Sequence, residues 1–143
     1  MLLFEKLDLK LEDAVISRFV VRYGETDQMA FAYYGRYFEW FEVARVDWLK
    51  DKGVTYKEME ENNVFLPVVE AKSKYISPNR YDDEIIIFTW AKSVTKRKIE
   101  FLHIVKNSRT KLITTEAEIC LIPVDKLGKP TRFNEKYFNL FQS

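Results

Sequence analysis

Hydrophobic and polar residues follow two different periods along the chain, which predict one long helix and a set of strands. β-Branched and aromatic residues dominate residues 15–23, so this segment is predicted to be a strand that ends at the polar corner Gly24–Gln28. From Tyr34 to Lys52 the apolar residues recur every three or four positions, and Gly53 follows as a stop. Because the apolar face of this helix is broad, we expect other parts of the chain to surround it.

The second half of the chain is dominated by the period of strands. A short helix over residues 55–62 comes first, because Thr55 and Glu58 have the spacing of a capping box. A final short helix is predicted at residues 135–141, whereas residues 1–13 show no firm period. Four strands joined by short polar turns are predicted between the two helices, over residues 64–75, 84–94, 98–105 and 112–122.

This order predicts a single α+β domain, residues 1–143, in which a curled antiparallel sheet of five to six strands wraps around one long helix. A single sheet leaves two unpaired edges, and pairing across a two-fold axis is one way to cover an edge. We therefore expect a homodimer or a homotetramer. Aromatic residues make up 15% of the chain, a high share that fits a subunit interface or an apolar ligand site.

Charge and hydropathy argue against several classes of partner. The 23 Lys and Arg residues balance 22 Asp and Glu residues without forming a basic stripe, so no nucleic-acid partner is expected. The apolar opening Met1–Phe4 is too short for a signal peptide. No apolar run approaches the roughly 20 residues that cross a bilayer. We therefore expect a cytoplasmic protein with no membrane partner.

The chain has one cysteine, Cys120, and one histidine, His103, and both fall in predicted strands. No disulfide, metal site or cofactor is expected. A Ser–His or Cys–His mechanism is not supported either, because the only histidine lies in a predicted strand. The remaining candidate is Asp27, which precedes the long helix. Its ordinary role would be a helix cap or turn carboxylate, and its chemical role a general base or nucleophile. Spacing alone favours the ordinary role; Glu25, a possible second carboxylate, is expected to be a solvated loop charge.

The corner and the helix carry a recognisable motif. The segment Tyr23–Tyr37, followed by Glu42-Val43-Ala44-Arg45, resembles the signature of the 4-hydroxybenzoyl-CoA thioesterase-like acyl-CoA thioesterases, which have the hotdog fold. The spacing Tyr75-x-x-Pro78-x-x-Tyr81-x-Asp83 and the loop Gly128-Lys129-Pro130 also fit, so the resemblance extends over residues 15–133. Two positions depart from the family pattern: its usual Gly is Ala30, which restricts the loop if a positive φ is required, and its usual Asn is Arg36.

The resemblance implies hydrolysis of an acyl or aryl thioester to the free acid and coenzyme A, which is part of the substrate rather than a cofactor. Asp27 would be the general base or nucleophile. The thioester carbonyl would lie near the backbone N–H at Tyr34, with Gly35 beside it, since a helix N-terminus suits a developing oxyanion. Tyr33 and Arg36 would lie near the acyl channel.

Four further interpretations remain open from the sequence. The basic turn Lys96-Arg97-Lys98 is predicted either to bind the coenzyme A phosphates, through Arg97 and Lys98, or to be an ordinary charged hairpin. Glu42 and Arg45 are expected to pair with each other on the helix, with the alternative that Glu42 faces the site. The alternative function is a non-catalytic acyl-CoA-binding or interaction module, suggested by Ala30 and Arg36. A dehydratase is weaker still, because it would want a histidine beside its carboxylate.

Overall fold

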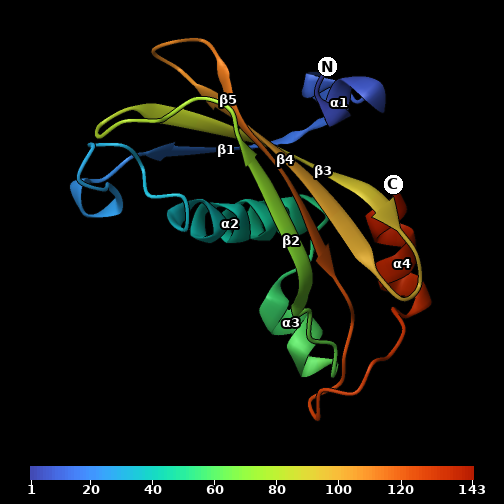
Figure 1. Cartoon of the computed structure of the whole chain (residues 1–143). Helices are drawn as coiled ribbons and strands as arrows, with labels where there is room; N and C mark the ends of the chain where they lie inside the picture. Colours follow the sequence, from blue (N-terminus) through green and yellow to red (C-terminus); the bar gives the residue numbers. More distant parts are fainter.

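A computed structural model of the protein describes residues 1–143, and its elements follow the predicted order (Figure 1). The five strands form one antiparallel sheet in the order β1-β3-β4-β5-β2. The elements are α1 Leu3–Lys6, β1 Val15–Val20, α2 Arg36–Asp51, α3 Tyr56–Glu61, β2 Val68–Tyr75, β3 Glu84–Val94, β4 Ile99–Asn107, β5 Ile113–Leu121 and α4 Glu135–Gln142, with 3-10 turns at Leu11–Asp13 and Tyr23–Glu25.

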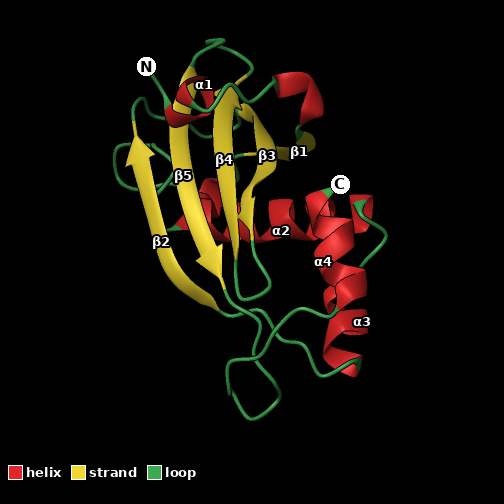
Figure 2. Ribbon diagram, turned by 90° about the vertical axis from the view of Figure 1, so that its right-hand side faces the viewer, coloured by secondary structure: helices red, strands yellow, loops and turns green.

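Helix α2 lies across one face of the curved sheet, as Figures 1 and 2 show from two sides. The face of the helix that meets the sheet is strongly aromatic. The ring of Phe41 stacks on His103 at 4.8 Å, and Trp48 packs edge-on against Phe101 at 5.1 Å. All four side chains are buried. The predicted α+β architecture, a sheet wrapped around one long helix, is therefore confirmed.

The first residues form a small cover on the opposite face of the sheet, which the sequence did not predict. The buried Glu116 carboxylate on β5 accepts hydrogen bonds from the backbone N–H groups of Leu3, at 2.9 Å, and Phe4, at 3.1 Å. Phe4 stacks on Trp90 of β3 with ring centroids 5.7 Å apart. These contacts stabilise helix α1, whose four residues show no helical spacing of hydrophobic positions.

The observed elements are shorter than predicted at several ends. Helix α2 begins at Arg36 rather than Tyr34, and β2 begins at Val68 rather than residue 64. The predicted capping box of α3 is half formed: the Thr55 hydroxyl accepts from the N–H of Glu58 at 3.1 Å, but the Glu58 carboxylate pairs with Lys136 instead. The tertiary ion pair replaces the reciprocal capping bond.

The candidate site lies at one end of the edge strand β1. Val20 at the end of β1 lies beside Glu84 at the start of β3, so the corner after β1 lies at this end of the sheet. The other edge is β2, whose residues are nearly all exposed. No helix in the chain combines the length and the apolar character needed to cross a bilayer.

Candidate active site

The corner after β1 is anchored by a buried carboxylate, Glu25. It accepts hydrogen bonds from the backbone N–H of Arg22 at 2.8 Å and from the indole N–H of Trp40 at 2.9 Å. Burial by itself raises the pKa of Glu25, but these hydrogen bonds and the Arg22 side chain hold it below its usual value. The expectation that Glu25 is a solvated loop charge was wrong. It attaches the corner to helix α2, and no sequence signal separated it from an exposed glutamate.

Asp27 organises the exposed loop that follows. Its Oδ1 atom accepts the N–H groups of Met29 at 2.8 Å and Phe31 at 3.2 Å, and its backbone N–H donates to the carbonyl of Phe31 at 2.8 Å. It does not cap α2, because the N-cap residue is Gly35. The carboxylate is thus a turn residue with one oxygen fixed, while Oδ2 has no partner within the chain and is free for chemistry.

Ala30 lies in the left-handed region of backbone space, with φ at 63°. The family pattern has glycine here, and the structure shows why: the loop turns back so that the Ala30 N–H donates to the Asp27 carbonyl at 3.0 Å. For a residue with a Cβ atom, this conformation costs about 1–2 kcal/mol. The departure therefore adds strain to the loop.

The start of α2 presents backbone donors without partners. The N–H groups of Tyr34 and Gly35 make no hydrogen bond within the chain, whereas the Tyr34 carbonyl accepts the hydroxyl of Tyr75 at 2.8 Å. Free N–H groups and the partial positive charge of a helix start together favour an anion. A Cβ atom on Gly35 would lie 2.9 Å from the Tyr33 ring, so the close packing of that ring explains the glycine.

One cavity of about 250 Å³ lies between the carboxylate residue and Tyr34, one of these two donors. Asp27 and Tyr34 both line it, and the other predicted site residues do not. Most of its wall is aromatic or aliphatic. The full lining is Asp27, Phe31, Ala32, Tyr34, Tyr37, Tyr75, Ile76, Ser77 and Pro78.

The other predicted substrate-binding residues lie elsewhere. Arg36 pairs with Glu39 at 2.9 Å in the first turn of α2, and Tyr33 packs against the ring of Tyr34 at 4.6 Å. Arg97 and Lys98 are in the turn between β3 and β4, at the far end of β3 from the Asp27 corner (Figure 1). Ten residue steps of strand separate the two ends, about 33 Å. Within one chain, these two side chains do not meet the Asp27 cavity.

A buried polar network supports the cavity wall and was missed in the sequence. Asn79, fully buried, donates to the Tyr37 hydroxyl at 3.0 Å and accepts from Asn107 at 3.0 Å. Asn107 also donates to the Asp83 carboxylate at 2.8 Å, and Arg109 donates two further hydrogen bonds to it, at 2.8 and 3.0 Å. These residues join three separate segments of the chain, so only Tyr37 and Asp83 were visible beforehand, through the family motif.

The network makes a pH-dependent contribution to stability. The Arg109 guanidinium lowers the pKa of Asp83 from 3.8 to about 2. The backbone N–H of Arg80 and the side-chain amide of Asn107 also lower it by donating hydrogen bonds to the carboxylate. Because the pKa of Asp83 is lower in the folded state than in the unfolded state, its ionised carboxylate stabilises the fold at pH values above the unfolded-state pKa. This stabilisation is lost as the pH falls through the folded-state pKa, that is, between about pH 4 and pH 2. We expect Asp83→Asn to reduce the free energy of unfolding by about 2 kcal/mol at pH 7 and by less at pH 3.

Urea denaturation of both proteins between pH 7 and pH 3 measures that gap. Asp82→Asn is the matched control, because its exposed side chain makes no ion pair, and it should leave stability unchanged. A gap between wild type and Asp83→Asn that stays constant down to pH 3 would contradict the ion-pair explanation.

The remaining candidates have structural positions. His103 is completely buried, and burial lowers its pKa well below the usual value, followed by the effect of the nearby Arg45 charge. Burial also disfavours the charged form of Cys120, and therefore raises the pKa of its thiol. Neither residue lines the Asp27 cavity. The expectation that Glu42 and Arg45 pair was wrong: Arg45 is buried without an ion pair, and Glu42 is exposed.

Comparisons with known proteins identify the family of the chain. The model of the thioesterase-like superfamily matches residues 21–138. A Bacillus subtilis (strain 168) protein named "Putative acyl-CoA thioesterase YneP" is 34% identical over 120 residues, which cover 82% of this chain and 85% of that one. Among solved structures, a DHNA-CoA thioesterase from Staphylococcus aureus has 26% identity and a TM-score of 0.84, covering 89% of this chain and 87% of that one.

A second solved structure, the 1,4-dihydroxy-2-naphthoyl-CoA thioesterase Slr0204 from Synechocystis, has a TM-score of 0.82 over 91% of this chain and 96% of that one. At 11% identity it supports the fold alone. The family model and the Bacillus relative each extend over most of the chain. The chain therefore belongs to the thioesterase-like superfamily and is a thioester hydrolase with the hotdog fold.

Proposed function

We propose that this protein hydrolyses acyl-CoA thioesters, preferably those with an aryl acyl group, in the cavity between the Asp27 loop and the start of α2. One observation carries the proposal: a carboxylate with a free oxygen, Asp27, and a residue with an unpartnered N–H group at the helix start, Tyr34, line the same small cavity. These are the two parts that thioester hydrolysis requires, an activator for the attacking oxygen and a stabiliser for the oxyanion.

The reaction is balanced with these groups alone. Asp27 accepts a proton from a water molecule whose oxygen bonds to the thioester carbon, and the carbonyl oxygen becomes an oxyanion held by the N–H of Tyr34. Collapse of this intermediate breaks the carbon–sulfur bond, and the proton passes to the departing coenzyme A thiolate. In the second route Asp27 itself bonds to the carbonyl carbon, expels the thiolate and forms an anhydride that water then cleaves.

The size and the walls of the cavity support an aryl group. A volume of about 250 Å³ is at the small end for a ligand site. Tyr34, Tyr37 and Tyr75 supply ring faces and edges, which favour a planar aromatic acyl group. The name of the Staphylococcus structural relative, a DHNA-CoA thioesterase, is a second support for a coenzyme A substrate.

The exposed edge strand β2 supports a homodimer formed by pairing β2 with its copy. Its backbone groups on the free edge are unpaired, and such an edge is normally covered. Tyr75, which binds the Tyr34 carbonyl, is the last residue of this strand. A dimer would therefore enclose the cavity further. Arg97 and Lys98 remain candidates for coenzyme A phosphates only through such an assembly.

The proposal is tested by measuring free thiol release from benzoyl-CoA, hexanoyl-CoA and palmitoyl-CoA. We expect turnover of benzoyl-CoA, with kcat/KM about tenfold or more above that for palmitoyl-CoA, since a small ring-lined cavity discriminates by fit. Tight binding of all three compounds without thiol release would contradict the proposal and favour the non-catalytic acyl-CoA-binding module.

A further inference from the structure

Tyr75, the last residue of β2, connects the edge of the sheet to the turn before α2. Its hydroxyl donates to the main-chain carbonyl of Tyr34 at 2.8 Å. Its ring lies edge-on against the rings of Tyr34 and Tyr37, with centroids 6.2 and 5.0 Å away. All three tyrosines line the Asp27 cavity. The Tyr75 hydroxyl therefore contacts the very residue whose N–H group faces the proposed chemistry.

The main chain of Tyr34 has no other hydrogen bond within the protein. Its N–H is free, and α2 begins only at Arg36, so the helix does not hold Tyr34 in place. Its side chain is 61% exposed. The carbonyl of the preceding residue, Tyr33, accepts the N–H of Arg36 at 2.9 Å. Of the two peptide groups with free N–H groups, one is thus held by the main chain and the other by Tyr75.

A hydrogen bond to a peptide carbonyl acts on the whole peptide group. The Tyr34 carbonyl and the Gly35 N–H share one rigid plane, so a donor at the oxygen fixes the direction of that N–H. The same bond restrains the Tyr34 Cα atom at the edge of the plane, and with it the Tyr34 N–H. Hydrogen bonds in a chain also strengthen one another, by about 10–30% each. Burial raises the pKa of Tyr75, so its hydroxyl keeps its proton and remains a donor at neutral pH.

We propose that Tyr75 is a positioning residue for thioester hydrolysis: its hydroxyl holds the Tyr34 main chain where the Tyr34 N–H meets the developing oxyanion. The inference rests on the function proposed for the Asp27 cavity. Donors that are fixed before the reaction stabilise the transition state without reorganising, and a small misplacement of such a group costs rate. Loss of the hydroxyl should therefore lower kcat and change KM little.

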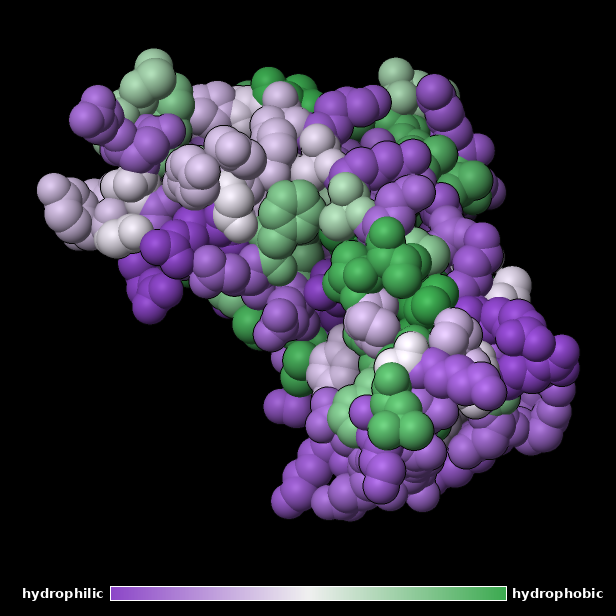
Figure 3. All heavy atoms as spheres, turned by 60° about the horizontal axis from the view of Figure 1, so that its bottom comes forward, coloured by the Kyte–Doolittle hydropathy of each residue, from purple (hydrophilic) through white to green (hydrophobic).

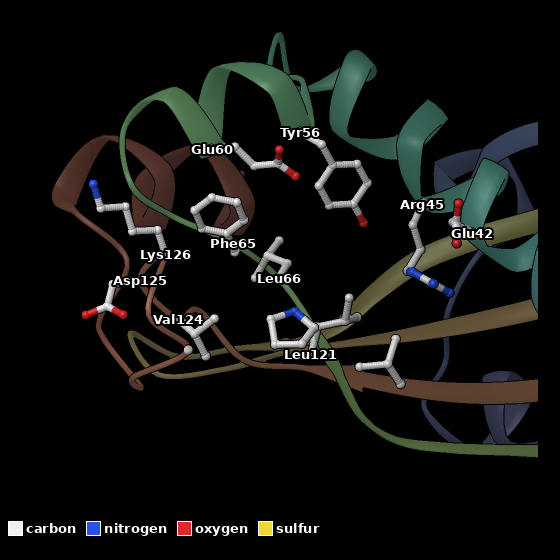
Figure 4. Close-up of a pocket in the computed structure, with 13 residues that line it drawn as sticks. Glu42, Arg45, Tyr56, Glu60, Phe65, Leu66, Leu121, Val124, Asp125 and Lys126 are labelled. Atoms are coloured by element: carbon white, nitrogen blue, oxygen red, sulfur yellow. The ribbon is translucent and has the colours of Figure 1, made fainter.

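A second and larger cavity of the molecule lies apart from Tyr75. It has a volume of about 720 Å³ and lies between α2, α3 and residues 65–68, with Arg45 and Tyr56 directed into it (Figure 4). Figure 3 shows apolar side chains gathered between hydrophilic margins on the face that is turned forward there. This cavity shares no lining residue with the Asp27 cavity. A change at the Tyr75 hydroxyl therefore reports on the Asp27 cavity.

The test compares kcat and KM for benzoyl-CoA in the wild type and in Tyr75→Phe, which keeps the ring and removes only the hydroxyl. We expect kcat to fall about tenfold and KM to stay within about twofold. Tyr137→Phe is the matched control, because its buried hydroxyl on α4 accepts one hydrogen bond, from Asn62 at 3.3 Å, and does not line the cavity. It should keep both constants. Tyr75→Leu also removes the ring from the cavity wall and should raise KM in addition.

An infrared measurement separates positioning of the donor from a general loss of structure. Phenacyl-CoA is a ketone that resists hydrolysis, and its carbonyl band, isolated by a ¹³C label, reports the hydrogen bonds to that oxygen. We expect the band of the bound ketone at higher wavenumber in Tyr75→Phe than in the wild type, and at the wild-type position in Tyr137→Phe. An unmoved band, or an unchanged kcat beside an active wild type, overturns the inference. The band requires no turnover, so a wild type that releases no thiol contradicts the proposed function while the band still decides the role of Tyr75.

Discussion

Replacing Asp27 by asparagine should lower kcat for benzoyl-CoA hydrolysis by about 10²–10⁴-fold, the usual contribution of a general base. The amide cannot accept a proton from water or form an anhydride, so both routes are blocked. It still offers an Oδ1 atom to the N–H groups of Met29 and Phe31, which hold the loop at 2.8 and 3.2 Å. The loss should therefore appear in turnover rather than in folding.

The measurement is the steady-state rate of thiol release for wild type and variant at equal protein concentration. Asp51→Asn is a suitable control, because this exposed carboxylate at the far end of α2 undergoes the same chemical change. It should keep the wild-type rate. Equal rates for wild type and Asp27→Asn, with unchanged melting temperatures, would remove Asp27 from the mechanism.

The second large effect is expected at the start of α2. Gly35→Pro removes the unpartnered N–H group next to that of Tyr34; if both groups hold the oxyanion, loss of one such donor typically costs about 10²–10³ in kcat. The backbone at Gly35 has φ at −68°, which proline adopts readily, and the Gly35 N–H makes no hydrogen bond that proline would remove. The helix should thus be retained, as circular dichroism would show.

Gly35→Ala provides the matched control for this variant. Both substitutions add a Cβ atom that meets the Tyr33 ring at 2.9 Å, but only proline lacks the N–H group. We expect alanine to cause a much smaller loss of kcat than proline. If alanine and proline reduce kcat equally, crowding of Tyr33 rather than the missing donor explains the effect.

The sequence predicted the elements whose periodicity comes from a single extended interface. Helix α2 and strands β3, β4 and β5 each bury a continuous apolar face, so their hydrophobic spacing is regular and their order could be inferred. Helix α1 could not, because its four residues are held by Glu116, more than 110 positions away. No local pattern records such a contact.

The candidate site was predictable in part, and mainly through the family motif. Spacing alone made Asp27 an ordinary turn residue, and the structure shows that it does serve the turn while keeping one oxygen free. The helix start indicated free backbone N–H groups in general, and the family resemblance pointed to Tyr34 with Gly35 beside it; both N–H groups have no partner in the structure. The sequence did not reveal that Arg45 is buried without an ion pair to Glu42, because the local i,i+3 spacing favours a pair.

The central claim, that Asp27 and the start of α2 act on one thioester carbonyl, is tested most directly by a crystal structure with phenacyl-CoA. This analogue keeps the carbonyl but has a methylene between it and sulfur, so it resists hydrolysis. We expect its oxygen about 2.7–3.1 Å from the N–H of Tyr34 or Gly35, with Asp27 facing the carbonyl carbon directly or through one water. A carbonyl bound away from both groups, for instance beside Arg45, would contradict the account.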